Sequence, residues 1–182
     1  LKPLPFPNAQ ELVWIAPPPS SCGMSCATYS ADAYAGLRDA NRSLQGLTGY
    51  FAFSGPDNLR LEGRGDPTPA TGLDVVTNFF DVLGVPPLMG RTFTDEDTRP
   101  GARPVAVLSR AYWQRQFAGD SSVIGSTVVL KGRQTTIIGV LPSTFDFGSI
   151  FAPGSRVDLF TPLNLVEARD WGNIVTLLGR LG

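Results

Sequence analysis

The 182-residue sequence contains no histidine. Without an imidazole, a histidine general base, a Ser-His-Asp triad and most zinc or iron sites are excluded. The sequence also lacks a P-loop, a G-x-G-x-x-G or G-x-S-x-G motif, and any spacing typical of metal ligands. These absences argue against an enzyme, so we expect no catalytic, cofactor-binding or metal-binding residues.

Positive charge and long apolar runs are also scarce. Lysine occurs only at Lys2 and Lys131, and the formal net charge is −1. Binding to nucleic acid would need a basic stripe, so we set nucleic acid aside as a partner. No apolar run approaches the roughly 20 residues that cross a bilayer, and no signal-peptide pattern opens the chain. Because Leu1 is not a start methionine, we expect an excised piece, and a piece of a membrane protein would have the same features.

Cysteine is limited to Cys22 and Cys26, which lie in a small polar stretch. A separation of four residues permits a disulfide only if the loop turns back on itself. An oxidising compartment would favour the bridge. The alternative is two loop cysteines that need no partner, and the sequence leaves both interpretations open.

The densest acidic run is Asp95, Glu96 and Asp97. Thr94 precedes it in the S/T-x-x-D/E form of a helix start, which is the simplest interpretation. A divalent-cation site would need more oxygen ligands at loop spacing, and the EF-hand pattern is missing. Composition would also allow a pair of carboxylates as in glycosidases, but nothing places a substrate cleft beside them.

Glycine and proline are frequent, with 20 and 16 residues, which favours turns and short strands. The first part predicts β-α-β-β-β, with a helix that begins at Ser30 or Asp32 and ends near Arg42. A stripe of Tyr34, Leu37 and Leu44, with Ala33 and Ala40, should be buried. The expected strands are 12–15, 47–54, 59–64 and 70–76.

The second part predicts a short helix at 78–83, stopped by Gly84, and a helix at 110–117 that Ser109 caps. Strands are expected at 104–109, at 157–160 and at 173–178. A hairpin should join 127–131 to 134–141 across Gly132 and Arg133. The aromatic loop from Phe145 should tuck into the core. The side chains expected to be mostly buried are Trp14, Phe80, Leu83, Val107, Trp113, Phe117, Ile138 and Val140.

Several short motifs follow one another in a fixed order. They are Glu11–Ile15, Leu37–Leu47, Asn78–Val85 (NFFDVLGV), Gly90-Arg91, Pro100–Ser109 (PGARPVAVLS), Val123–Gly125 and Ile138–Pro142. In order and spacing, the chain from about Glu11 onward resembles the extracytoplasmic core domain of MacB-type ABC transporter permeases, the FtsX-like permease group.

The resemblance implies an α+β fold with a ferredoxin-like (porter-type) layer, partly incomplete, and an inserted β-rich (sabre-type) subdomain. The implied division is 1–79 for the first part of the porter-like subdomain, 80–165 for the insertion, and 166–182 for the return strand. A ferredoxin-like layer usually has two helices. This chain offers one of suitable length, so we expect the strand at 173–178 to be poorly ordered or stabilised by a neighbouring copy.

The resemblance also implies a role and partners. Such a domain lies between two transmembrane helices on the periplasmic or outer side of the bacterial inner membrane. It is non-catalytic, needs no cofactor, and couples ATP hydrolysis in a cytoplasmic ATP-binding domain to mechanical work or efflux. The implied partners are its own transmembrane helices, that ATP-binding domain, a second copy in a homodimer and, where one exists, a periplasmic adaptor. The alternative is a binding or assembly module of an envelope protein unrelated to transport.

Overall fold

The computed structural model describes residues 6–18 and 27–182. Cys22 and Cys26 lie outside these ranges, so their disulfide stays a prediction. The strands are β1 (Leu12–Ile15), β2 (Leu44–Phe51), β3 (Leu59–Glu62), β4 (Thr68–Ala70), β5 (Gly72–Val75), β6 (Met89–Gly90), β7 (Val105–Leu108), β8 (Thr127–Leu130), β9 (Arg133–Val140), β10 (Leu159–Pro162) and β11 (Val175–Leu181). The α-helices are α1 (Ala31–Ala40), α2 (Phe79–Leu83), α3 (Arg110–Phe117) and α4 (Phe147–Phe151).

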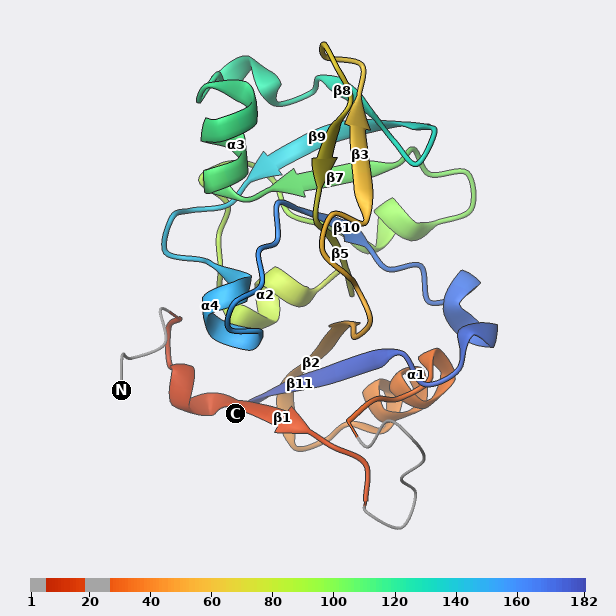
Figure 1. Ribbon diagram of the computed structural model, residues 1–182. Helices are drawn as coiled ribbons and strands as arrows, with labels where there is room; N and C mark the ends of the chain where they lie inside the picture. Colours follow the sequence, from red (N-terminus) through yellow and green to blue (C-terminus); the bar gives the residue numbers. More distant parts are fainter. Residues whose placement is uncertain (1–5, 19–26) are drawn as a thin grey trace.

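The described strands form one mixed sheet in the order β1-β11-β2-β5-β10-β7-β9-β8-β3-β4, with β6 paired to β9. The β5–β10 and β7–β9 pairs are parallel, and the other named pairs are antiparallel. In Figure 1, α1 lies by β2 and β11 at one end, α3 lies by β7 and β9 at the other, and α2 and α4 lie between. This is the mixed α+β fold that the sequence predicted.

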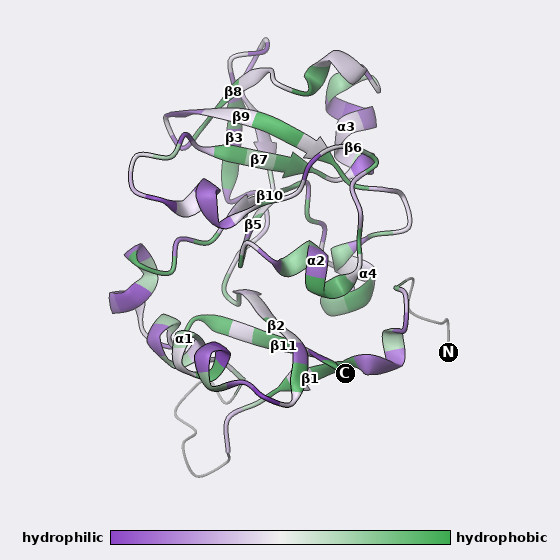
Figure 2. Ribbon diagram, turned by 180° about the vertical axis from the view of Figure 1, so that it is seen from behind, coloured by the Kyte–Doolittle hydropathy of each residue, from purple (hydrophilic) through white to green (hydrophobic). Residues whose placement is uncertain are grey.

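Apolar side chains fill three clusters along this sheet. Figure 2 shows the hydrophobic colour concentrated in interior elements such as β7, β9, β11 and α2. The burial predictions are confirmed for Phe80, Leu83, Val107, Trp113, Phe117 and Val140. Ile138 is half-buried. No helix in residues 6–18 and 27–182 combines the length and apolar character needed to span a membrane.

The prediction that Trp14 is buried is wrong, since 55% of this residue is exposed. Its strand, β1, is at the edge of the sheet and pairs only with β11. The Trp14 ring contacts Tyr50 and Phe151 edge-on, at 6.4 and 5.6 Å between centroids. The short apolar run Leu12–Ile15 correctly predicted a strand there, but it could not tell that the strand has a single neighbour.

The helix α1 begins as predicted, because the Ser30 Oγ accepts a hydrogen bond from the Ala33 N–H at 3.1 Å. The predicted buried stripe is wrong except at Tyr34: Ala33, Leu37 and Ala40 are exposed, and Leu44 is half-buried in β2. Ala31 and Tyr34 are buried, whereas 41% of Leu37 is exposed. The first turn of the helix is thus the part that the protein interior covers. Burial raises the pKa of Tyr34 to about 12, and its neutral hydroxyl donates to the Leu47 carbonyl.

The strands β3 and β4 lie at the opposite end of the sheet from β2. The sequence placed residues 59–64 and 70–76 together with β2 in the sheet of the first subdomain. Instead β3 pairs with β8, with Leu61 opposite Leu130, and β5 alone stays next to β2. Leu59 and Leu61 alternate with polar residues, and they pack with Leu130 in the cluster beneath α3. The packing of Leu59 and Leu61 in this cluster therefore places β3 next to β8.

Glycine is required at one turn and at one close approach between two strands. The β8–β9 hairpin turns at Lys131 and Gly132, both at positive φ, and not at Gly132 and Arg133 as predicted. A two-residue turn of this type needs positive φ at both central positions. Where β6 crosses β9, Gly90 is opposite Gly139, and a Cβ on Gly139 would overlap the Arg91 carbonyl. A Cβ on Gly90, which is itself at positive φ, would likewise overlap the Ile138 carbonyl, so the close approach requires glycine at both positions.

The last strand, β11, is an interior strand of the sheet. The prediction that it would be poorly ordered or need a neighbouring copy is therefore wrong. β11 lies between β1 and β2 and pairs with both. Val175 and Leu177 pack in the cluster that includes Tyr34, while Leu178 packs on the other face in the cluster that includes Phe80. The aromatic loop is also tucked in as predicted, since Phe145 is buried in that second cluster.

Candidate functional site

The acidic run forms the start of a short helix, as predicted. The 3-10 helix η3 (Asp95–Thr98) follows Thr94, whose N–H donates to Asp97 Oδ2 at 2.8 Å within a capping box. Each carboxylate has a different partner. Asp95 accepts a hydrogen bond from the Thr77 hydroxyl, Glu96 pairs with Arg99, and Asp97 pairs with Arg91. The three side chains therefore do not converge on one point.

Of the three carboxylates in the acidic run, that of Asp97 is buried and accepts hydrogen bonds from both Arg91 and Thr94. Its side chain is 7% exposed, and Arg91 donates to its two oxygens at 2.8 and 2.9 Å. Burial by itself raises the pKa of Asp97. The hydrogen bonds from Arg91 and Thr94 outweigh this effect and hold the pKa below its usual value of 3.8.

We expect Asp97→Asn to lower the free energy of unfolding by about 1–2 kcal/mol at pH 7, since it removes a charge-assisted pair. Because the folded-state pKa is depressed, the contribution is complete above the usual pKa of 3.8 and is lost as the pH falls through the folded-state value. Urea unfolding from pH 7 downward should show the gap between the two proteins closing below about pH 4. Glu96→Gln, at an exposed pair, is the control. A gap that stayed constant on acidification would contradict the assignment.

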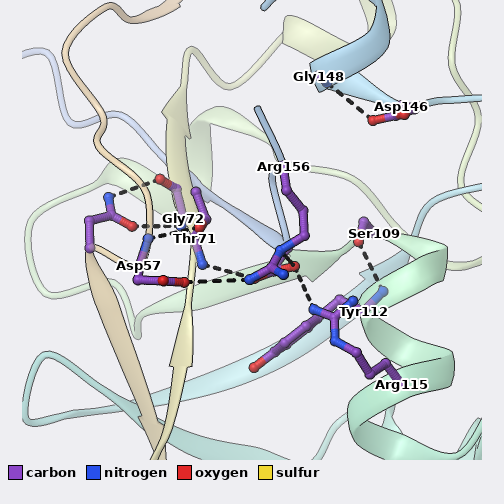
Figure 3. Close-up of polar contacts among 11 residues, drawn as sticks. Asp57, Thr71, Gly72, Ser109, Tyr112, Arg115, Asp146, Gly148 and Arg156 are labelled. Atoms are coloured by element: carbon purple, nitrogen blue, oxygen red, sulfur yellow. Dashed lines mark hydrogen bonds and ion pairs between the residues drawn. The ribbon is translucent and has the colours of Figure 1, made fainter. Parts of the chain in front are cut away.

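A second polar cluster centres on Asp158, which is 1% exposed at the start of β10. Its Oδ1 accepts from Arg115 Nη2 at 2.8 Å and from Arg156 Nε at 3.0 Å. Its Oδ2 accepts from the Thr71 N–H at 2.9 Å. Figure 3 shows Arg156 reaching toward Asp57 and Thr71 on one side and Arg115 on the other.

The Asp158 cluster joins segments that are distant in the sequence. Arg115 comes from α3, Thr71 precedes β5, and Asp57 lies in the loop before β3. The Thr71 hydroxyl accepts from the Asp57 N–H at 2.9 Å, and the Ser109 N–H donates to the Asp158 carbonyl at 2.9 Å. The Asp158 carboxylate, with its three donors, therefore ties α3, β10 and the segment before β5 together.

Two hollows on the surface of the described part are large enough to consider as binding sites. One of about 420 Å³ is lined by Trp171 and by side chains of both signs, among them Asp74, Glu167, Lys131 and Arg133. Another of about 380 Å³ lies beside α1, with Asp32, Arg38, Asp95 and Arg169 in its lining. Both hollows are lined by positive and negative side chains, so the charge of the lining favours neither an anionic nor a cationic ligand. Within residues 6–18 and 27–182, no three Asp, Glu or Cys side chains gather as a metal site would require.

Sequence reasoning missed Asp158 and the buried Arg180 of β11. Both carried a detectable signal, because each is a lone charge within an apolar strand pattern, Val157–Phe160 and Leu177–Leu181. A charge in such a pattern is buried with partners or marks a strand end. The partners themselves lie far away in the sequence and could not be inferred.

The fold recurs in extracytoplasmic parts of bacterial transport proteins. The periplasmic region of MacB from Actinobacillus actinomycetemcomitans matches with a TM-score of 0.64 and 18% identity, over 94% of this chain and 73% of that one. The extracellular domain of the noncanonic ABC-type transporter YknZ from Gram-positive bacteria matches with a TM-score of 0.62 and 20% identity, over 94% and 82%. A domain of a Porphyromonas gingivalis protein named as a permease matches with a TM-score of 0.68 and 17% identity, over 97% and 77%.

The family model for the MacB-like periplasmic core domain matches residues 4–180. The chain therefore belongs to this family and is the periplasmic core domain of a MacB/FtsX-like ABC transporter permease, which confirms the resemblance seen in the sequence. The alternative of an envelope module unrelated to transport is not supported by this match. No curated protein matched the chain.

Proposed function

We propose that this domain is non-catalytic and transmits movement between the membrane and the periplasm. ATP binding and hydrolysis in a separate cytoplasmic domain would move it through two transmembrane helices that flank it in the full protein. The work would drive efflux or another mechanical task. In this proposal the full protein is a homodimer, and an adaptor binds where the cell provides one.

The observation that carries the proposal is the pairing of the first and last strands. β1 and β11 are antiparallel neighbours from Leu12 opposite Arg180 to Ile15 opposite Leu177. The end of β11 lies beside β1 in Figure 1. A movement that enters the domain through either strand would thus reach the other strand through their hydrogen bonds.

The division into 1–79, 80–165 and 166–182 remains part of this proposal. We make one exception within 1–79: β3 and β4 would move with the inserted part, because β3 pairs with β8. The end of the sheet with β1, β11 and β2 would then be the part next to the membrane helices. The other end, with β7, β9, β8 and β3, would follow the movement of the first end.

The test uses the full permease in lipid nanodiscs with its ATP-binding domain. Hydrogen exchange of the peptides that cover 6–15 and 175–181 should change when ATP is added, because both strands would bear the movement. The control is the isolated chain with ATP, which should not respond. Identical exchange with and without ATP in the full permease would reject the coupling role. A response of the isolated chain would mean that this domain itself binds nucleotide, which would contradict the proposal that ATP acts in a separate cytoplasmic domain.

A further inference from the structure

Arg180 is a charged residue buried in the last strand, with 9% of it exposed. It follows Leu178 on the same face of β11, the face packed on the cluster that includes Phe80 and Leu83. Burying a guanidinium among apolar side chains is costly unless its donors are used. The partners of Arg180 therefore indicate what the residue is for.

The guanidinium joins three segments of the chain. Its Nε donates to the Val82 carbonyl in the last turn of α2 at 2.6 Å. Its Nη1 donates to the Pro7 carbonyl at 3.2 Å and to the Glu11 carboxylate at 3.1 Å. Val82 O is one of the helix-end carbonyls that lack a partner within the helix, and a cation is favourable at that end.

The end of α2 closely fits this arrangement. Gly84, at φ +70°, terminates the helix with a left-handed conformation. A Cβ on Gly84 would lie 3.4 Å from the Pro7 ring and 3.8 Å from Arg180 Nη2. Both are ordinary van der Waals distances, so it is the positive φ, and not lack of space, that favours glycine at the point where the helix end, Pro7 and the guanidinium meet.

Stability alone does not account for an arginine here. Its Nη2 is buried and has no hydrogen-bond partner. An apolar side chain of similar volume would avoid this unsatisfied donor, and such replacements of buried ion pairs are often neutral or stabilising. What only the arginine provides is a simultaneous hold on α2 and on the segment that leads into β1.

We propose that Arg180 is a positioning residue that makes α2 move together with β1 and β11. The inference rests on the proposed function, since it names the residue through which movement of the two strands reaches the rest of the domain. α2 packs on β2 and β11, and its buried Phe80 contacts Phe160 of β10. In the sheet, β10 lies between β5 and β7, so this contact connects α2 to the end of the sheet that includes β7, β9 and β8. Arg180 thus links the strands next to the membrane helices to the core of the domain.

Hydrogen exchange of the full permease without nucleotide tests the link. In Arg180→Met, exchange should rise on the order of tenfold in the peptides covering 6–15 and 79–85, because both lose the same partner. Exchange in β9, 133–140, should not change. Arg169→Met is the matched control, since Arg169 pairs with Asp32 on the surface, with both side chains about 60% exposed.

The outcomes separate the alternatives. Faster exchange in 6–15 alone would make Arg180 a local support of that segment and would overturn the link to α2. If Arg180→Met raised exchange everywhere, Arg180→Lys would decide instead, since lysine keeps the charge but its single ammonium cannot donate to Val82 and to the N-terminal segment as the guanidinium does. A rise in that variant confined to 6–15 and 79–85 would support the link, and a rise at 6–15 alone would overturn it.

Adding ATP tests the transmission. In the wild type, the ATP-dependent change should extend from 6–15 and 175–181 to 79–85. In Arg180→Met it should stop at the two strands, while the ATPase rate stays within about twofold. A change that still reached 79–85 would overturn the positioning role. If the wild type showed no ATP-dependent change at all, the proposed function would fail, and the measurement without nucleotide would still decide whether Arg180 links the segments.

Discussion

Replacing Asp158 with asparagine should lower the free energy of unfolding by about 2–4 kcal/mol. The carboxylate accepts from two arginines on one oxygen and from the Thr71 N–H on the other. An asparagine amide has one NH₂ group, so either orientation sets a donor against a donor at a side chain that is 1% exposed. Arg115 and Arg156 are half-exposed, and water can solvate them afterwards, which keeps the loss below that of a fully buried pair.

Urea unfolding followed by circular dichroism measures this loss. Asp57→Asn is the matched control, because Asp57 pairs with the same Arg156 at 3.4 Å but is 56% exposed. We expect less than about 0.5 kcal/mol for that change. Equal losses in the two variants would contradict the view that Asp158 joins α3, β5 and β10.

Truncating Trp113 to alanine should cost about 3–5 kcal/mol. Trp113 is 8% exposed and packs with Phe117 and Val123 beneath α3. Its Nε1 donates to the Asp120 carbonyl at 2.9 Å, which fixes the chain just after the helix. Alanine would leave a cavity and remove the donor, and both effects lower the free energy of unfolding.

Trp14→Ala is the comparison for Trp113→Ala, measured by the same urea unfolding. Trp14 is 55% exposed on an edge strand, so we expect a loss of about 1 kcal/mol or less. A loss below about 1 kcal/mol at Trp113 would place that side chain on the surface and reject the packing described for α3.

The residues at helix ends were predictable because their effects act over a few positions. Ser109 caps α3 by accepting from the Tyr112 N–H at 3.2 Å, and Gly84 ends α2 at positive φ. Both interactions use neighbours within the same turn. For the same reason the sequence correctly predicted Thr94 as the start of η3, and the acidic run as part of a helix start.

Burial was predictable only where other elements cover the apolar face of a helix or strand. Phe117 in α3 and Val107 in the central strand β7 are buried as their patterns indicated. Trp14 lies in an apolar run and Leu37 in a helical apolar stripe, yet both are exposed, since β1 is an edge strand and α1 is covered at its first turn. A periodic pattern identifies the apolar face, and the surrounding elements decide whether that face is covered.

The sequence by itself determined most of the longer elements, the α+β class and the family, because these depend on local spacing and on motif order along the chain; it missed β6 and α4. Tertiary structure alone decided that β3 lies against β8, that β11 is enclosed by β1 and β2, and that two charges are buried. Arg180 meets Val82 across 98 residues, and Asp158 meets Thr71 across 87. Contacts of that range follow from how the whole chain packs its apolar faces, and no local pattern encodes them.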